Sequence, residues 1–313
     1  MADFVMRKKL LVIGCSPAWE RMYRFDEFHP GEVNRAVEVR EYPAGKATNL
    51  CRAVKEFGCP CETTLVTLLD EVEGARFRQG CEAEGIQLVT VNTFSRLRTC
   101  TNLISRNHGM TELIEEASPV TAGEMELLLH LIERAAPTYD GVVLAGSIPN
   151  GSPEELAGEI AHAVRKAGKP LYIDNWKNFS DMASWGCVKA IKINREELQN
   201  LTHEEGVEAG IKALQDEWPD MAIGVTDGAN PAWLGVGGSS PRIVMIEPPK
   251  AASLVNPLGA GDACSGVFFA NLIWNRDPEE SFAEALDAAT KSCASLVAGS
   301  PRVEARGDAP APA

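Results

Sequence analysis

Asn256-Pro257-Leu258-Gly259-Ala260-Gly261-Asp262-Ala263 is the stretch that decides how this chain is interpreted. Two glycines flank one small residue, and the apolar run from Cys264 to Trp274 predicts that a helix begins there. Converging backbone N–H groups and the positive end of a helix form an anion site. A carboxylate would repel that anion, so Asp262 is interpreted as a base that deprotonates a hydroxyl attacking a phosphate. The alternative is an ordinary helix start with a stabilising aspartate.

Composition excludes several classes of partner. The 313 residues are 45% hydrophobic and 24% charged, as is usual for a globular enzyme. A net charge of −14 argues against nucleic acid or an anionic membrane as the main partner. No apolar stretch reaches the ~18–20 residues of a membrane helix. Nine scattered cysteines without a C-x-x-C pair predict reduced thiols, so we expect a cytoplasmic protein that acts on a small molecule.

Short apolar runs alternate with amphipathic stretches along most of the chain. This alternation predicts an α/β fold with a central, mostly parallel sheet and helices on both faces. The predicted strands cover residues 10–16, 63–69, 141–146, 171–174, 190–194 and 222–226. The predicted helices cover residues 46–57, a segment from Thr121 with a capping box to Glu124, a segment from Ser152-Pro153 to near Gly168, and residues 261–275 and 278–298.

Two segments break this alternation and predict a small second sheet. Residues 22–28 with 37–42, and 96–106 with 110–116, have the spacing of hairpins with polar residues interleaved. We therefore expect a lid formed by residues 17–42 and 93–116, inserted into a main domain of residues 1–16, 43–92 and 117–300. A sheet of this size is not stable alone, so it must lie over the main domain or against a second subunit, and we expect a homodimer through it. Residues 301–313 are expected to be a disordered tail.

Two common phosphate-binding motifs are absent from the sequence. Gly45-Lys46 is followed by Ala47 rather than Ser or Thr and lacks the earlier glycine, so it is not a P-loop. Gly235-Val236-Gly237-Gly238 has the wrong continuation for a dinucleotide-binding turn. The phosphate-binding candidate is therefore the turn at Gly259–Asp262.

Together with that turn, a series of short motifs resembles the ribokinase-like (PfkB) carbohydrate kinases, and within them the 1-phosphofructokinase and tagatose-6-phosphate kinase branch. The motifs are Ser16-Pro17-Ala18, Gly31–Arg35, Ala44–Asn49 with Arg52-Ala53, Arg98–Asn102, Thr111–Glu115, Gly146–Gly151, Ile191–Leu198 and Val225–Ala229. They stand in the family's order over residues 8–300. It is the ordered set that supports the resemblance, since each piece alone is weak.

The resemblance implies roles for particular residues. Asp262 would activate the substrate hydroxyl, and Gly259, Ala260 and Gly261 would form an anion hole for the transferred group. ATP would be the phosphoryl donor, with Mg²⁺ met by Glu197 through water. Lys192, Asn194, Thr226, Asp227, Gly228 and Asn256 would bind the nucleotide, and Glu20, Arg35, Gly45, Lys46, Asn49, Arg98 and Ser147 the sugar. Arg35 and Arg98 are candidates for a phosphate already on the sugar, because guanidinium forks suit phosphate oxygens.

Most of these residues also have a purely structural interpretation. Lys46 could be an exposed first-turn lysine, and Arg35 and Arg98 could be solvated sheet residues. Asn194 could cap a helix with Glu197 as a first-turn acid, and Ser147 could be a turn former. These alternatives remain open at the level of the sequence.

Three departures from the family pattern concern the sugar more than the phosphoryl machinery. Ala44 and Ala47 replace glycines, Glu20 replaces an aspartate, and Ile193 replaces a proline. Fructose 1-phosphate is the first expected substrate, followed by tagatose 6-phosphate and fructose 6-phosphate. The alternatives are a kinase for an unphosphorylated sugar or nucleoside, and a non-catalytic sugar-binding regulator on the same fold.

Overall fold

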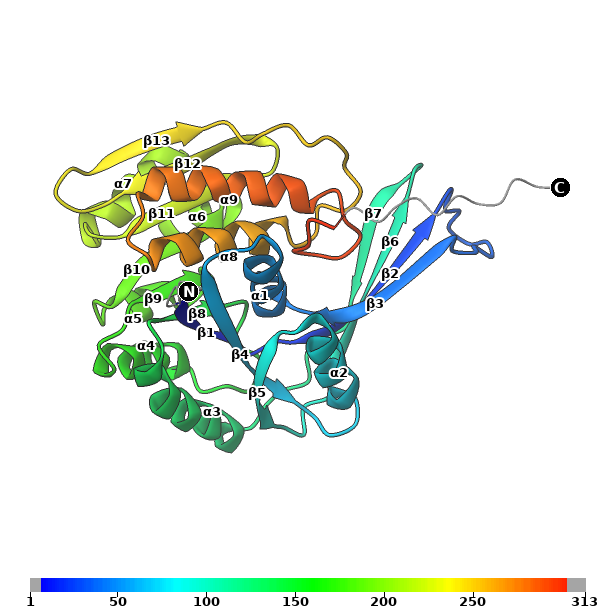
Figure 1. The fold of residues 1–313 in the computed structure, drawn as a ribbon, viewed down its shortest axis with the longest axis horizontal. Coiled ribbons are helices and arrows are strands. Elements are labelled where there is room, and N and C mark those ends of the chain that lie inside the picture. The colour runs from blue at the N-terminus through cyan, green and yellow to red at the C-terminus, as the bar shows by residue number, and fades with distance from the viewer. Residues whose placement is uncertain (1–6, 303–313) are drawn as a thin grey trace, which may run out of the picture.

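The computed structural model describes residues 7–302, and within them a nine-stranded sheet forms the centre of the molecule (Figure 1). Its order is β13-β12-β11-β10-β9-β8-β1-β4-β5. The strands are β1 Lys8–Gly14, β4 Cys61–Leu69, β5 Gln87–Asn92, β8 Gly141–Ala145, β9 Leu171–Asp174, β10 Val188–Asn194, β11 Ala222–Asp227, β12 Asn230–Val236 and β13 Arg242–Ile246. Pairing is parallel except for β12 and β13, which join antiparallel at one edge. The mostly parallel sheet confirms the sequence prediction.

Helices cover both faces of this sheet because its strands are apolar on both sides. In β1, Leu11 and Ile13 pack into one core, while Leu10 and Val12 pack into the other. The first core includes α3, α4, α5, α6 and α7, and the second includes α1, α2, α8 and α9. The helices are α1 Lys46–Glu56, α2 Gly74–Glu84, α3 Ala122–Ala135, α4 Leu156–Lys166, α5 Phe179–Ala183, α6 Arg195–Thr202, α7 Val207–Glu217, α8 Ala260–Leu272 and α9 Pro278–Ser292, with a short 3-10 turn at Ala136–Thr138.

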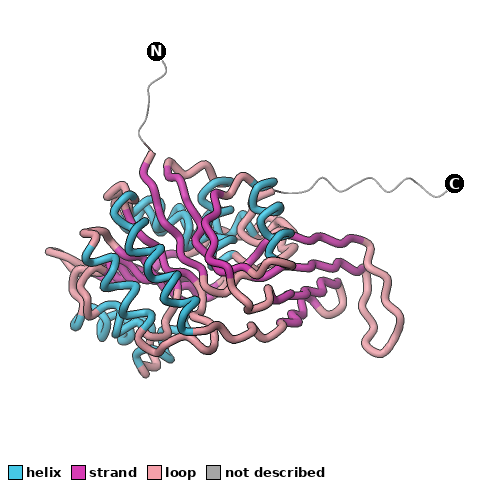
Figure 2. Tube along the Cα trace, turned by 90° about the horizontal axis from the view of Figure 1, so that it is seen from below, coloured by secondary structure: helices cyan, strands magenta, loops and turns pink. Residues whose placement is uncertain are grey.

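A second, four-stranded sheet projects from the layered body (Figure 2). Its order is β3-β2-β6-β7, with β2 Ala18–Phe25, β3 Glu38–Ala44, β6 Arg98–Ser105 and β7 Gly109–Ile114. Each predicted hairpin is present, and the two hairpins join through parallel pairing of β2 with β6. Met22, Tyr42 and Ala44 on its inner face pack against Leu296 and Ala298 of the main body. This contact anchors the small sheet, which we call the lid.

Two predicted helix boundaries are wrong by four or more residues, the first because of local turns and the second because of tertiary contacts. Helix α4 begins at Leu156 rather than Ser152, because Gly151 at φ +86° and Pro153 form turns before it. Helix α9 ends at Ser292 rather than residue 298, because the chain turns so that the Leu296 carbonyl accepts hydrogen bonds from other segments.

Other expectations have mixed outcomes. The capping box from Thr121 to Glu124 is confirmed. Seven of the nine cysteines are buried and two are half-buried. No helix within residues 7–302 is long and apolar enough to span a bilayer. The expected tail lies almost wholly outside the described residues, which end at Arg302.

Candidate active site

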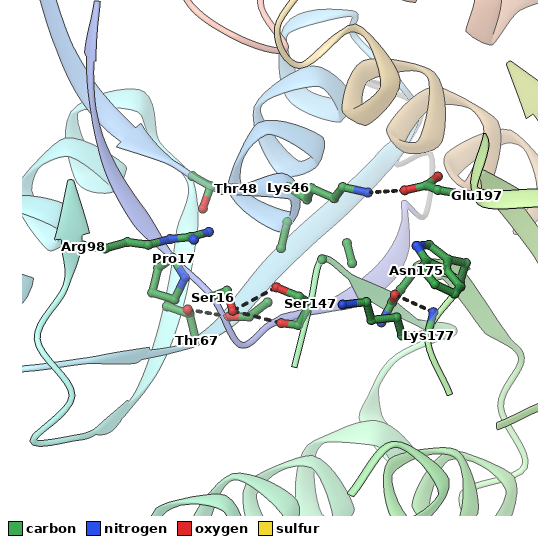
Figure 3. A pocket seen from close by; sticks show the side chains of 16 residues that line it. Ser16, Pro17, Lys46, Thr48, Thr67, Arg98, Ser147, Asn175, Lys177 and Glu197 are labelled. Atoms are coloured by element: carbon green, nitrogen blue, oxygen red, sulfur yellow. Dashed lines mark hydrogen bonds and ion pairs between the residues drawn. The ribbon is translucent and has the colours of Figure 1, made fainter. Parts of the chain in front are cut away.

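A cavity of about 250 Å³ lies where the carboxyl ends of the central strands meet the start of α1 (Figure 3). Four predicted sugar-site residues line it, as does the predicted magnesium residue. The lining residues are Gly14, Ser16, Pro17, Gly45, Lys46, Ala47, Thr48, Thr67, Arg98, Ala145, Gly146, Ser147, Asn175, Trp176, Lys177 and Glu197. The structure therefore gathers segments that are far apart in the sequence into one site.

Arg35 is not brought to this cavity. It lies exposed in the loop between β2 and β3, away from the residues that line the pocket. Ala44 is also absent from the lining, because it is buried in the contact between lid and body. Ala47 does line the cavity and sits against Gly14, where a Cβ on Gly14 would lie 2.3 Å from the Ala47 Cβ. Ala44 and Ala47 both replace glycines of the family pattern, but only Ala47 can affect the shape of the pocket.

The predicted anion hole lies at the start of α8. Gly259 is the N-cap at φ +77°, and a Cβ there would lie 2.6 Å from the Ala298 Cβ, so only glycine fits. The N–H groups of Gly261 and Asp262 donate to no acceptor within residues 7–302, whereas the Ala260 N–H donates to the Pro257 carbonyl at 3.3 Å. The free donors and the helix dipole favour an anion at Gly261, but the Ala260 N–H is already engaged.

Asp262 is buried beside this anion hole, with 8% of its surface exposed. Its Oδ2 accepts a 2.8 Å hydrogen bond from Asn49 Nδ2. Burial, together with the negative charge of Asp174, raises the pKa of Asp262 to about 6, although Lys46 and Asn49 oppose the shift. Such a carboxylate is ionised at neutral pH yet basic enough to take a proton from a hydroxyl.

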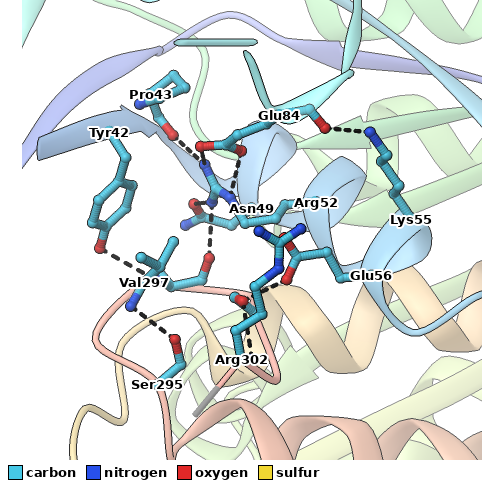
Figure 4. Close-up of polar contacts among 12 residues, drawn as sticks. Tyr42, Pro43, Asn49, Arg52, Lys55, Glu56, Glu84, Ser295, Val297 and Arg302 are labelled. Carbon is cyan, nitrogen blue, oxygen red and sulfur yellow. Dashed lines mark hydrogen bonds and ion pairs between the residues drawn. The ribbon is translucent and has the colours of Figure 1, made fainter. Parts of the chain in front are cut away.

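Arg52 fixes the orientation of the Asn49 amide (Figure 4). Its guanidinium is fully buried and donates to Asn49 Oδ1 at 2.8 Å, to the Ala298 carbonyl at 2.8 Å and to Glu84. Because the amide oxygen accepts from Arg52, the amide nitrogen must face Asp262. Sequence reasoning used Arg52 as a motif residue and gave it no role.

Asp174, at the end of β9, was missed from the sequence. Lys46 Nζ lies 3.1 Å from Asp174 Oδ1 and 3.6 Å from Glu197 Oε1. Ser265 Oγ donates to Asp174 Oδ2 at 2.6 Å. Burial opposes ionisation of Asp174, but the charges of Lys46 and Lys192 outweigh it, and the pKa of Asp174 lies below its ordinary value. The available signal was an acid closing a buried strand at the ligand-binding edge of a parallel sheet.

These contacts show that Lys46 is not a freely solvated lysine. The charge of Asp174 raises the pKa of Lys46 above its ordinary value, against the opposing effect of burial. The lysine is therefore held as a cation between two carboxylates. Lys192, 4% exposed on β10, is close to the anion hole, since a Cβ on Gly261 would lie 2.9 Å from its Nζ.

The other predicted nucleotide residues have structural roles in addition to any role in binding. Asn194 and Glu197 form a capping box on α6, so the structural interpretation of that pair is confirmed, while Glu197 Oε1 faces Lys46. Asn256 is buried, accepts from the Leu258 N–H at 2.9 Å and donates to the Leu296 carbonyl at 3.1 Å, which holds the turn before α8.

The β11–β12 hairpin carries the last three of these predicted residues. Thr226 Oγ1 donates to the Ile193 carbonyl at 3.5 Å, and Gly228 forms the turn at φ +59°. Asp227 accepts from Arg195 at 3.2 Å, so its carboxylate is paired within the protein.

The inner face of the lid carries two predicted sugar residues. Glu20 is buried on β2 and accepts a hydrogen bond from Asn102, and burial raises its pKa to about 7. It does not line the cavity, whereas Arg98 does, with its Nε buried and without a partner among the described residues. Ser147 also lines the cavity, and its carbonyl accepts from Ser16 Oγ at 2.9 Å.

These features define a class of protein. A buried carboxylate with a raised pKa, free N–H donors at a helix start and a cation-lined cavity are features that phosphoryl-transfer enzymes use. A family model described as "pfkB family carbohydrate kinase" matches residues 8–305, and the chain belongs to this family.

Solved structures share the fold at low sequence identity. Phosphofructokinase-2 from Escherichia coli in complex with fructose-6-phosphate is 20% identical with a TM-score of 0.80, and the match covers 94% of this chain and 96% of that one. A possible 1-phosphofructokinase from Thermotoga maritima is 15% identical with a TM-score of 0.79, covering 92% of this chain and 93% of that one. These similarities confirm the predicted ribokinase-like fold.

Proposed function

We propose that this carbohydrate kinase transfers a phosphoryl group from ATP to a small sugar phosphate. Fructose 1-phosphate is the first candidate, with tagatose 6-phosphate and fructose 6-phosphate next. The observation that supports the proposal is the position of Asp262, a buried base beside free N–H donors. The charge of Lys46 acts on Asp262, and Lys46 lines the cavity together with Arg98, whose Nε is buried without a partner among the described residues. That one similar structure holds fructose-6-phosphate is consistent with this substrate class.

The proposed chemistry is an in-line displacement. A sugar hydroxyl gives its proton to Asp262 while its oxygen forms a bond to the terminal phosphorus of ATP, and the bond from that phosphorus to the ADP oxygen breaks. The Gly261 and Asp262 N–H groups and the Lys192 ammonium stabilise the negative charge that develops. The lid would exclude water from the reacting groups.

A magnesium ion would neutralise charge on the phosphates. Within residues 7–302, no group of three or more His, Cys, Asp or Glu side chains is placed to hold a metal ion by itself. Glu197 fits a Mg²⁺ ion that is bound mainly by phosphate oxygens and water, because its Oε1 faces the site beside Lys46.

A coupled assay of ADP release tests this function. Each of the three ketohexose phosphates is compared with the corresponding free sugars, with Asp262→Asn as the blank. Release with a phosphosugar, lost in the variant, supports the proposal. Nucleosides are included as further acceptors. ADP release with free sugars or nucleosides alone would favour the alternative, a kinase for an unphosphorylated sugar or nucleoside. Sugar binding without ADP release from any acceptor would identify a non-catalytic regulator.

We also propose a homodimer through the lid. Val39 and Leu113 on the lid strands are about half exposed, at 47% and 53%, and open sheet edges tend to pair. One similar structure is a tetrameric form of phosphofructokinase-2. Light scattering should give twice the monomer mass, and Leu113→Glu should reduce it. A strict monomer at assay concentration would contradict the proposal.

A further inference from the structure

Two positive charges in the cavity have no carboxylate partner. Lys46, Arg98 and Lys177 all line the cavity, and Figure 3 shows their side chains extending into it from three different segments. Lys46 is neutralised by Asp174 and Glu197. Neither Arg98 nor Lys177 forms an ion pair with a carboxylate in the part of the chain that the structure describes, and Lys177 Nζ lies 5.8 Å from the Trp176 ring centroid. Lys46, Arg98 and Lys177 together with Asp174 and Glu197 give a net charge of about +1, and the two cations without an ion-pair partner are Arg98 and Lys177.

The turn that follows β9 also presents a neutral donor. Asn175 is 6% exposed and lines the cavity. Its Oδ1 accepts a 2.9 Å hydrogen bond from the Lys177 N–H, which fixes the orientation of the amide. Its Nδ2 is then buried without a partner among the described residues. An unpaired buried amide is costly unless a ligand completes it.

The start of α1 faces the same cavity. Residues Gly45–Thr48 line it, and the N–H groups of Lys46, Ala47 and Thr48 donate to no acceptor within residues 7–302. This helix is 11 residues long, so its positive end adds to the field. The two cations, the Asn175 amide and the start of α1 all line this cavity, and each favours the binding of an anion there.

We propose that Lys177 and Asn175, together with Arg98, form the subsite for the phosphate that the sugar already carries. Lys177 supplies the second cation that the sequence had led us to expect from Arg35. A phosphate monoester carries about −1.5 to −2 charges at pH 7, which matches the two unpaired cations. This inference rests on the proposed function and assigns its substrate specificity to the turn at residues 175–177.

The first test removes one of these charges. Lys177→Met keeps the length of the side chain and should lower kcat/KM for the phosphosugar about 10–100-fold, mainly through KM. Turnover of the free sugar should stay within about twofold, because it never makes the contact. Lys177→Arg should restore most of the loss, and Lys212→Met, on the exposed face of α7, is the matched control.

The second test changes the amide. Asn175→Asp keeps an oxygen that accepts from the Lys177 N–H but replaces the buried donor by a negative oxygen. The Asn175→Asp variant should lower kcat/KM for the phosphosugar, and not for the free sugar, by at least as much as Lys177→Met does. Equal losses for both acceptors, or no loss for either, in both variants would overturn the inference while leaving the kinase function in place.

Binding without ATP separates the two proposals. Calorimetry should show that Lys177→Met weakens the binding of fructose 1-phosphate about 10–100-fold and changes the binding of fructose little. If the wild type binds the phosphosugar but never phosphorylates it, the proposed function fails and the subsite stands. If wild type and variant bind it equally, the subsite is wrong whatever the turnover.

Discussion

Asn49 Nδ2 donates a 2.8 Å hydrogen bond to Asp262 Oδ2, joining two residues that are 213 positions apart. Arg52 holds the other end of the amide, and Glu84 in turn accepts from Arg52. A chain of polar contacts therefore runs from α2 through α1 to the start of α8. It places a donor, and not an acceptor, against the base, so this hydrogen bond favours the ionised form of Asp262, against the burial and the Asp174 charge that raise its pKa.

Asp262→Asn removes the proton acceptor while it keeps the shape of the side chain. We expect turnover to fall by a factor on the order of 10²–10⁴, with ATP binding largely unchanged. Steady-state kinetics and nucleotide titration measure the two effects. Asp216→Asn on the surface of α7 should behave as the wild type. Near-normal turnover in the Asp262 variant would assign the base elsewhere.

The pH dependence of turnover follows from the pKa of Asp262, which burial raises to about 6. The ionised form is the active base, so kcat should fall as pH drops through about 6 and be insensitive to this group above it. Asn49→Ala removes a donor to the ionised form, so the acidic limb should move to higher pH. A limb that stays in place would show that the hydrogen bond does not tune the base.

Gly261→Val should abolish turnover and retain the fold. A side chain at this position meets Lys192 Nζ, 2.9 Å from the new Cβ, and covers the free N–H donors of the helix start. Circular dichroism should be unchanged, while kcat falls at least about 100-fold. Wild-type kinetics in this variant would place the transferred phosphate elsewhere.

Arg52→Met should lower both stability and turnover. It leaves Asn49 Oδ1 and the Ala298 carbonyl without a donor and Glu84 without its cation. The cost should be roughly 3–5 kcal/mol, as for a broken buried ion pair, measured by urea unfolding. Arg134→Met, on the exposed face of α3, serves as the control. Unchanged stability would mean that the network contributes nothing to folding.

Arg98→Ala tests the other unpaired cation. If Arg98 contacts the substrate phosphate, kcat/KM for the phosphosugar should fall about 10–150-fold, and the free sugar should be unaffected. Equal losses for the two acceptors would mean that Arg98 acts on closure of the lid or on folding. In the double variant Arg98→Ala with Lys177→Met, the loss of kcat/KM for the phosphosugar should be less than the sum of the two single losses on the free-energy scale, because both residues would bind the same phosphate.

Much of the main sheet could be predicted from local patterns. All six predicted strands are present, because parallel strands buried on both faces are apolar throughout and stand out from the amphipathic helices between them. Strands β5 and β13 form the sheet edges, β12 lies next to β13, and all three lack that continuous pattern. The start of α4 was wrong because a serine and a proline satisfy the pattern of a helix start while the backbone forms turns there instead.

By itself, the sequence determined that a small-residue turn and Asp262 open a buried helix near the end of a kinase-like α/β chain. Caps, turns and strand periodicity depend on residues a few positions apart in the chain, so they can be predicted from the amino-acid sequence. Only the tertiary structure decided that Asp174 holds Lys46, 128 positions away, and that Lys177 rather than Arg35 enters the cavity. The sheet order that places β9 beside β8 and β8 beside β1 brings these side chains together, and ion pairs across such distances have no signature in local sequence.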